Sequence, residues 1–183
     1  KVAAITGAGS GIGRALAVAL AAKGCHLALC DVDEAGLEET KRQTAALGVR
    51  VTSEAVDVAN REAVYAWADR VAKEHGRVNL IFNNAGVAVA STVEKMSYGD
   101  FEWLMGVNFW GVVHGTKAFL PHLKASGEGH VINVSSVFGL AGIPSQSAYN
   151  SAKFAVRGFT ESLRQELDML GYGVSASCVH PGG

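Results

Sequence analysis

Short apolar runs alternate along this chain with longer amphipathic stretches, and this regular alternation limits the folds that the chain can adopt. The runs that indicate strands are residues 2–6, 26–30, 49–54, 78–82, 129–134 and 174–179. The stretches that indicate helices are residues 11 to about 23, about 34 to 47, 62–75, 98–124 and 146–170. Strict alternation of strands and helices requires right-handed crossovers, which build a doubly wound parallel sheet.

The predicted strands are mostly apolar throughout, rather than alternately apolar and polar. Strands of this kind belong in a parallel sheet that is covered on both faces. We therefore expect an α/β fold of the Rossmann type, in three layers with helices on both sides of the sheet. A chain of 183 residues suits one domain, and no linker, repeat or low-complexity segment divides it.

Composition narrows the classes of partner and site. A formal net charge of −1 gives no basic surface for nucleic acid or an anionic membrane, and no run of about 18 apolar residues would span a bilayer. The first residues lead directly into glycine-rich sequence, so we expect no leader peptide. Cys25, Cys30 and Cys178 are interpreted as free thiols in a reducing compartment, with the cytoplasm as the default location. Neither they nor the six histidines have metal-ligand spacing, so we expect no metal site.

Two of the predicted helices, 98–124 and 146–170, have little polar face. A helix that is apolar most of the way round is buried on more than one side. The sheet covers only one side, so the other side is expected to meet a second subunit, as in a homodimer or homotetramer. Further sequence at the C-terminal end would cover the same surface equally well.

The turn between the first strand and the first helix is rich in glycine. It carries the pattern Gly7-x-x-x-Gly11-x-Gly13, whereas the common G-x-G-x-x-G spacing is absent. In a doubly wound fold this turn binds phosphate, because backbone N–H groups and the positive helix end meet the anion there. A tight connection, or a site for the adenosyl group of a methyltransferase, would use a similar turn. The residues expected to contact a nucleotide are Gly7, Ser10, Gly11, Ile12 and Gly13.

Asp31 follows the second strand, twenty residues after Gly11. A carboxylate at this place accepts hydrogen bonds from the adenosine ribose and repels a 2′-phosphate. Val32 and Asp33 come next, so no cation follows directly to receive such a phosphate, and NAD is favoured over NADP. The alternative role for Asp31 is the N-cap of the following helix. Arg14, in the first turn of the first helix, is placed equally well for the pyrophosphate and for solvent.

Two further strand ends carry polar residues. Asp57 and Val58 end the third strand, where a carboxylate and a backbone group could face adenine, although a turn or an N-cap would also place Asp57 there. Asn83-Asn84-Ala85-Gly86 ends the fourth strand, where asparagines satisfy backbone groups and Gly86 permits close approach to a ligand. We expect Asn84, Ala85 and Gly86 beside the cofactor.

Tyr149 and Lys153 are four residues apart, and Ser136 precedes Tyr149 by thirteen. Side chains at i and i+4 share one face of a helix. The pKa of an unperturbed tyrosine is near ~10, and a neighbouring cation lowers the pKa of a phenol toward the range useful in general acid–base catalysis. Alone, this pair also fits a solvated helix surface.

Taken together, these residues resemble a short-chain dehydrogenase/reductase of the NAD(P)-dependent type. The resemblance covers essentially the whole chain and rests on motifs that occur in the family's order and spacing. The matching positions are Thr6-Gly7-x-x-x-Gly11-Ile12-Gly13, Asp57, Asn83-Asn84-Ala85-Gly86, Asn108, Ser136, Tyr149-x-x-x-Lys153 and Pro181-Gly182.

The resemblance implies a role for each catalytic position. Tyr149 would be the general acid/base, and Lys153 would both lower the tyrosine pKa and bind the nicotinamide ribose. Ser136, rather than the adjacent Ser135, would hydrogen-bond the substrate oxygen. Asn108 would hold a water that links Lys153 to solvent, although the sequence alone favours a polar break in an apolar helix. The chain at Pro181 and Gly182 would run beside the nicotinamide carboxamide.

The resemblance also sets the expected function. It implies hydride transfer between NAD(H) and a secondary alcohol or ketone, whereas a sensor or scaffold that keeps the fold and lacks the chemistry is the competing function. The segments 87–97 and 138–144 should line the substrate pocket, and their small, apolar residues suit a hydrophobic alcohol or carbonyl compound. Family members continue well past the Pro-Gly turn, so we expect residues 1–183 to be a domain that stops after its sixth strand.

Overall fold

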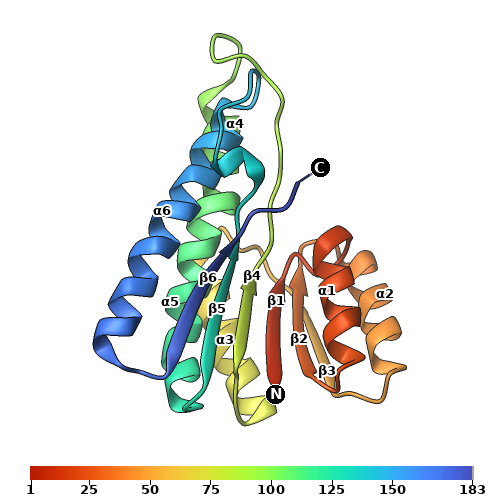
Figure 1. Cartoon of the computed structure of the whole chain (residues 1–183). Coiled ribbons are helices and arrows are strands. Elements are labelled where there is room, and N and C mark those ends of the chain that lie inside the picture. The colour runs from red at the N-terminus through yellow and green to blue at the C-terminus, as the bar shows by residue number, and fades with distance from the viewer. Residues whose placement is uncertain (183) are drawn as a thin grey trace.

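Six parallel strands form one sheet in the computed structural model, which describes residues 1–182 (Figure 1). The strands are β1 (Val2–Thr6), β2 (His26–Asp31), β3 (Val51–Ala55), β4 (Leu80–Asn83), β5 (Gly129–Val134) and β6 (Val174–Val179). Their order across the sheet is β3-β2-β1-β4-β5-β6. The chain thus runs outward from β1 in one direction and then from β4 in the other, and this reversal opens a crevice at the carboxyl ends of β1 and β4.

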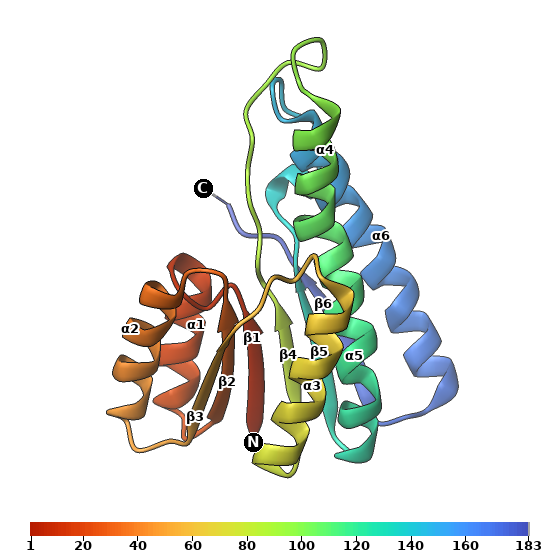
Figure 2. The same ribbon diagram turned by 180° about the vertical axis from the view of Figure 1, so that it is seen from behind.

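Helices connect the strands and cover both faces of the sheet (Figures 1 and 2). They are α1 (Gly11–Ala21), α2 (Glu34–Ala45), α3 (Arg61–His75), α4 (Tyr98–Met105), α5 (Gly111–Ala125) and α6 (Ser147–Leu170), with a π-helical segment η1 (Gly106–Trp110) and a 3-10 turn η2 (Val137–Gly139). The predicted fold class, a three-layer α/β/α sheet of the Rossmann type, is confirmed.

Alternate residues of the strands supply two separate cores. In β1, Ala3 and Ile5 pack with Ala17 of α1 and Leu37 of α2. Ala4, on the opposite face, belongs to the core formed by α3, α5 and α6. The largest side chain of that second core is Trp67, which lies edge-to-face on Phe119 with the ring centroids 5.0 Å apart. Because both faces of β1 are packed, all five of its residues are buried.

The predicted helix 98–124 is interrupted within its length. Its residues continue from α4 through η1 into α5, and η1 is bounded by Gly106 and Gly111. A π-helical turn inserts an extra residue into the helix and is common at functional sites. Hydrophobic periodicity does not reveal such a turn, because the apolar residues continue through it. The remaining element ends differ from the prediction by a few residues at most.

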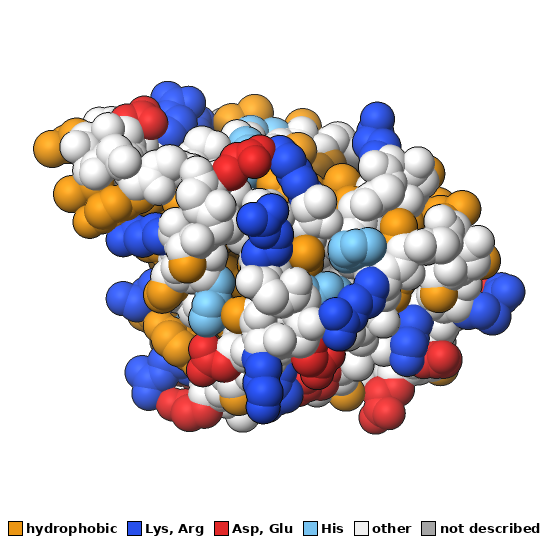
Figure 3. Space-filling view, turned by 90° about the horizontal axis from the view of Figure 1, so that it is seen from below, with side chains coloured by type: hydrophobic (Ala, Val, Ile, Leu, Met, Phe, Trp, Pro, Cys, Tyr) orange, Lys and Arg blue, Asp and Glu red, His pale blue; other side chains and the backbone are white. Residues whose placement is uncertain are grey.

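The segments α4, η1 and α6 expose large apolar side chains, as their composition indicated. Trp103 and Trp110 are 50% and 52% exposed, and Phe154 on α6 is 42% exposed. Within residues 1–182, no helix combines the length and apolar character needed to cross a membrane. At the opposite end of the molecule, where the strands begin, side chains of both charges are interspersed (Figure 3).

Candidate active site

A cleft of about 700 Å³ lies at the carboxyl ends of the strands. One wall comes from the glycine-rich turn after β1 and from the end of β2, and the other comes from residues after β5 and from the start of α6 (Figure 1). Most of the site residues that the sequence predicts line this cleft. They are Gly7, Ser10, Gly11, Ile12, Asp31, Val58, Asn84, Ala85, Gly86, Ser136, Tyr149, Lys153, Pro181 and Gly182. The sheet therefore brings together motifs that are up to 175 residues apart, counted from Gly7 to Gly182.

The glycine turn needs glycine where the backbone comes closest to its neighbours. A Cβ on Gly13 would lie 2.0 Å from the carbonyl oxygen of Gly7, and a Cβ on Gly7 would lie 2.7 Å from the Cα of Ala85. Gly7 also has a φ of +65°, which other residues adopt at a cost. The two glycines thus let α1 begin directly beside the turn, and Gly13 is buried behind the cleft surface.

Hydrogen bonds join the glycine turn to the end of β4. The hydroxyl oxygen of Thr6 accepts from the backbone N–H groups of Asn84 and Ala85, both at 3.0 Å. The side-chain amide of Asn84 donates to the carbonyls of Thr6 (3.0 Å) and Gly7 (3.2 Å). The asparagine thus satisfies strand-end backbone groups, as its place in the sequence indicated.

Asp31 lies at the cleft and does not cap a helix. Its carboxylate accepts from the N–H of Gly9 at 2.7 Å and from the N–H of Asp33 at 3.0 Å. The N-cap of α2 is Asp33, whose side chain accepts from the N–H of Gly36. The N-cap alternative for Asp31 is therefore wrong. Each carboxylate oxygen has a further lone pair, so Asp31 can still accept from a ligand hydroxyl.

Arg14 has surroundings that the sequence did not indicate, whereas Asp57 has one of the alternatives that were left open. Arg14 is half-buried and does not line the cleft, and it donates hydrogen bonds to the glycine turn and to α2. Asp57 accepts from the N–H of Ala59 at 2.9 Å and does not line the cleft, whereas Val58 does. The turn alternative thus describes the side chain of Asp57, because β3 ends at Ala55 and a turn begins at Asp57, whose carbonyl accepts from the N–H of Asn60 at 3.0 Å.

Tyr149 and Lys153 share one face of α6 and meet at the cleft. The ammonium nitrogen of Lys153 lies 5.5 Å from the centroid of the Tyr149 ring. The ring is also held edge-to-face by Phe138, with centroids 6.1 Å apart. Among residues 1–182, no protein group hydrogen-bonds the hydroxyl of Tyr149, which leaves that hydroxyl to a ligand.

Lys153 is buried, which is unusual for an ammonium group. It donates to the carbonyl oxygen of Val134 at 2.9 Å. Desolvation lowers the pKa of Lys153 to about 8, and the nearby Cys178 opposes this shift. The ammonium is thus held at the carboxyl end of β5, with few partners of its own.

Ser135 and Ser136 differ in what their hydroxyls contact. Ser135 is buried, and its hydroxyl donates to the backbone carbonyl of Lys153 at 2.8 Å. Ser136 is half-buried at the cleft, where its hydroxyl oxygen accepts from the N–H of Phe138 at 3.1 Å and keeps its own proton to donate. The geometry therefore favours Ser136 as the hydroxyl that reaches a ligand.

Asn108 has a structural task that the sequence did not reveal. It lies within η1 and is completely buried, behind the cleft surface. Its amide oxygen accepts from the N–H of Val87 at 2.7 Å, and its amide nitrogen donates to the carbonyl of Val87 at 2.8 Å. A Cβ on Gly86 would lie 3.4 Å from the Asn108 amide oxygen and 3.6 Å from the Lys153 ammonium. Asn108 thus fastens the segment after β4 next to Lys153.

Asn150 is a residue that the sequence analysis missed, although it adjoins Tyr149. It is buried, and its amide nitrogen donates to the carbonyls of Phe138 (2.6 Å) and Ala141 (2.8 Å). Its amide oxygen accepts from the N–H of Ile143 at 3.0 Å. All of these bonds secure the loop that carries Phe138 against Tyr149. The feature of the sequence that could have identified Asn150 is its position directly after Tyr149.

The rest of the cleft wall is apolar on the side of Tyr149. Of the two segments expected to line a substrate pocket, only Val87, Ala88 and Phe138 do so, because the remainder projects beyond the sheet (Figure 2). Trp103, Val107 and Gln146 complete this wall and were not foreseen. In the described part of the chain, no group of three His, Cys, Asp or Glu side chains could hold a metal ion.

Comparison with known proteins finds similarity over the whole chain. The family model described as short chain dehydrogenase matches residues 1–183. A protein of Mycobacterium tuberculosis that carries the name oxidoreductase SadH is 58% identical over 183 residues, which are 100% of this chain and 66% of that protein. The chain therefore spans slightly less than two thirds of that relative's length.

Solved structures also match the whole chain. A short-chain dehydrogenase/reductase from Burkholderia phymatum, in complex with NAD, has a TM-score of 0.97 and 42% identity, over 100% of this chain and 65% of that one. An alcohol dehydrogenase from Thermococcus sibiricus, complexed with 5-hydroxy-NADP, has a TM-score of 0.94 and 33% identity, over 100% of this chain and 76% of that one. The resemblance that the sequence motifs indicated is confirmed.

The buried ammonium of Lys153 should leave a signature in the pH dependence of stability. With a native pKa of about 8 against an ordinary 10.5, the native state loses this proton at lower pH than the unfolded chain. The cost of the buried charge is therefore present below pH 8 and disappears as the pH rises toward 10.5. Relative to Lys153→Met, the free energy of unfolding should rise by up to about 3 kcal/mol across this range. Urea denaturation at matched pH values measures the difference, and a flat or falling difference would contradict the burial of a charged amine.

Asn150→Asp should loosen the loop beside Tyr149 without disturbing the rest of the cleft. The carboxylate keeps the acceptor for Ile143 but loses both donor bonds, to Phe138 and Ala141. Amide hydrogen exchange in residues 137–143 should become about tenfold faster, as the loss of one or two hydrogen bonds implies. The control is Asn60→Asp at the N-cap of α3, where aspartate caps equally well. Equal exchange in the two variants would show that Asn150 does not hold the loop.

Proposed function

The chain belongs to the short-chain dehydrogenase family, and on that premise we propose that it transfers a hydride between NAD(H) and a secondary alcohol or ketone, with Tyr149 as general acid/base. One observation carries the proposal. The hydroxyls of Tyr149 and Ser136 and the ammonium of Lys153 lie at a single cleft. The same cleft is bounded by the glycine-rich turn and by Asp31.

The protein's groups divide the proton chemistry among them. Tyr149 donates its proton to a ketone oxygen in reduction, or accepts one from an alcohol in oxidation. Ser136 donates a hydrogen bond to the same substrate oxygen and stabilises its developing charge. Lys153, whose ammonium donates to the carbonyl of Val134, places a cation beside the phenol ring of Tyr149. When bound, the nicotinamide cofactor supplies or accepts the hydride.

Lys153 and Asn108 have further proposed roles. Lys153 binds the hydroxyls of the nicotinamide ribose, because its ammonium has N–H groups beyond the one donated to Val134. Asn108 holds a water that connects Lys153 to solvent, and its position beside Gly86 and Lys153 supports this relay. The two amide bonds to Val87 keep Asn108 in place for it.

The residues around the glycine turn fit a dinucleotide. The N–H groups at the start of α1, from Ser10 to Gly13, suit the pyrophosphate. The carboxylate of Asp31 suits the adenosine ribose and disfavours a 2′-phosphate, which supports NAD over NADP. Val58, which lines the cleft, would meet adenine together with the preceding Asp57, and Pro181 and Gly182, which also line the cleft, would meet the nicotinamide carboxamide.

The substrate should be a small hydrophobic alcohol or carbonyl compound. Val87, Ala88, Trp103, Val107 and Phe138 give the cleft an apolar wall on the side of Tyr149. Such a wall favours apolar substituents, because burying them removes apolar surface from water. No nucleic-acid or membrane partner is proposed.

We also propose that residues 1–183 form the NAD(P)-binding domain of a homodimer or homotetramer in the cytoplasm. The apolar surface of α4, η1 and α6, with Trp103, Trp110 and Phe154 exposed, supports an interface through the 98–124 and 146–170 segments. The cysteines are free thiols, and Cys25 and Cys30 are buried, which fits a reducing compartment.

Tyr149→Phe tests the proposed reaction, because it removes only the hydroxyl. The rate of NADH formation with a panel of secondary alcohols should fall by about 10²–10⁴-fold. The dissociation constant for NAD should change by less than about threefold, or roughly 0.6 kcal/mol. Wild-type protein that binds NAD but turns over none of the alcohols, or a Phe variant that is as active as the wild type, would contradict the proposal and favour a sensor or scaffold.

Asp31→Asn tests the cofactor preference. Loss of the negative charge should lower kcat/KM with NAD by about 10–100-fold, the worth of a charge-assisted hydrogen bond, and should raise kcat/KM with NADP. Steady-state kinetics with both cofactors measure the ratio. If the wild-type enzyme already prefers NADP, the proposed role of Asp31 is wrong.

A further inference from the structure

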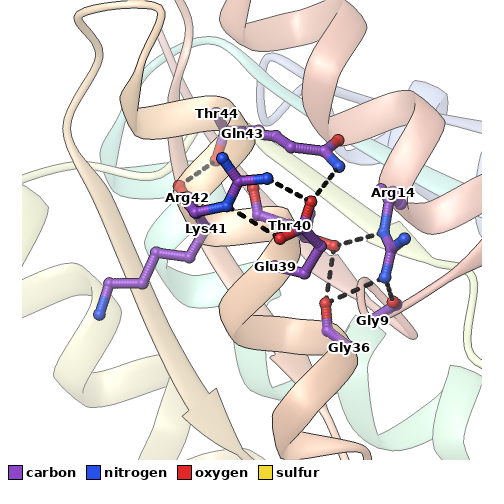
Figure 4. Close-up of polar contacts among 9 residues, drawn as sticks. All are labelled: Gly9, Arg14, Gly36, Glu39, Thr40, Lys41, Arg42, Gln43 and Thr44. Carbon is purple, nitrogen blue, oxygen red and sulfur yellow. Dashed lines mark hydrogen bonds and ion pairs between the residues drawn. The ribbon is translucent and has the colours of Figure 1, made fainter.

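Helix α2 reaches the glycine turn through Thr40, a residue with no assigned role. Thr40 is completely buried. Its hydroxyl lies 2.8 Å from the carbonyl oxygen of Ala8 and 3.0 Å from that of Gly36. The hydroxyl oxygen also accepts from the Nε of Arg14 at 2.9 Å. One side chain of α2 thus contacts both the turn after β1 and a side chain of α1. Figure 4 shows its contact with Arg14.

The guanidinium of Arg14 completes this connection. Its terminal nitrogen donates to the carbonyl oxygen of Gly9 and, at 3.2 Å, to that of Gly36. Figure 4 shows Arg14 directed at Gly9, Gly36 and Thr40. The planar fork of an arginine can serve several acceptors at fixed angles, which a lysine cannot. The N–H groups that bind the turn are therefore not available to a phosphate.

All four backbone polar groups of Ala8 and Gly9 have partners outside the turn. The N–H of Ala8 donates to the carbonyl of Cys30 at 3.0 Å, and its carbonyl accepts from Thr40 at 2.8 Å. The N–H of Gly9 donates to the carboxylate of Asp31 at 2.7 Å, and its carbonyl accepts from Arg14. This half of the turn is held by β2, α1 and α2, whereas phosphate binding falls to the amides that follow.

We propose that Arg14 and Thr40 are positioning residues for the cofactor. They fix Ala8 and Gly9, and through the Gly9 N–H they fix the Asp31 carboxylate at the place where the adenosine ribose binds. The proposal rests on the proposed function, since it concerns the dinucleotide site of that enzyme. It differs from a role of Arg14 as a phosphate ligand, because in this arrangement the shape of the side chain matters and not only its charge.

The chain offers a matched pair of variants for the test. Thr44 lies one turn after Thr40 on the same helix and is also completely buried. Among residues 1–182, its hydroxyl contacts only carbonyls of α2, those of Thr40 (2.8 Å) and Lys41 (3.1 Å). Thr40→Val and Thr44→Val therefore each remove one buried hydroxyl, but only the first releases the glycine turn.

Thr40→Val should weaken NAD binding, measured by calorimetric titration of the full chain, by about tenfold, the worth of one well-placed hydrogen bond. Thr44→Val should leave the dissociation constant for NAD within about threefold of the wild-type value. Thr40→Ser, which keeps the hydroxyl, should restore the affinity. Equal weakening by the two valine variants would overturn the proposal, because it would show a general loss of stability.

Arg14→Lys separates positioning from charge. The lysine keeps the charge but not the fork, so NAD binding should weaken about as much as in Thr40→Val. Wild-type affinity in Arg14→Lys would overturn the proposal and assign Arg14 to the phosphates.

Amide hydrogen exchange of residues 8–13, without NAD, gives a readout that is independent of the proposed function. It should be faster in Thr40→Val and Arg14→Lys, and unchanged in Thr44→Val. If the wild-type chain binds neither NAD nor NADP, the proposed function fails, while the exchange pattern still decides whether Arg14 and Thr40 hold the turn. Unchanged exchange in Thr40→Val overturns the proposal.

Discussion

The junction between the ends of β1 and β4 is the contact on which the rest of the site depends. The strand order reverses at this point, so the two halves of the sheet diverge and leave a crevice between their connections. Four hydrogen bonds close the junction, and all of them are donated by Asn84 or Ala85 after β4 to Thr6 or Gly7 at the end of β1. Without this junction, the glycine turn and the Tyr149 side of the cleft would belong to independently placed loops.

A buried network of polar side chains holds together the elements on the Tyr149 side of the cleft. The amide nitrogen of Asn83 donates to Thr116 (3.1 Å) and to the amide oxygen of Asn133 (2.8 Å), and Asn133 donates to Thr160 at 2.9 Å. The network links β4 and β5 to α5 and α6. Buried polar groups are costly unless they are paired, so these bonds specify how α6, and with it Tyr149, lies on the sheet.

Most of the fold, and most of the residues that line the cleft, could be predicted from the sequence, because periodicity and motif spacing are local signals; the roles expected of Ser136, Tyr149 and Lys153 came from the family resemblance. Strand and helix periodicity, the glycine pattern and the i,i+4 spacing of Tyr149 and Lys153 all lie within one element or one turn. The points that the sequence left open concern side chains that have a choice of partners. Arg14 and Asp57 had two plausible environments each, and Asp31 was weighed against an N-cap role that Asp33 performs. Asn108 and Asn150 bind backbone groups of other segments, 21 residues away for Asn108 and up to 12 for Asn150.

The sequence by itself determined the α/β class, the strand positions and the residue types of the site, because hydrophobic periodicity and glycine placement act over a few residues. Only the tertiary structure decided which polar side chains face the cleft and which hold the scaffold. Hydrogen bonds such as Thr40 to Ala8 and Arg14 to Gly9 join separate elements of the chain. Their partners are set by the packing of α1 and α2 against the sheet, and no local pattern encodes that packing.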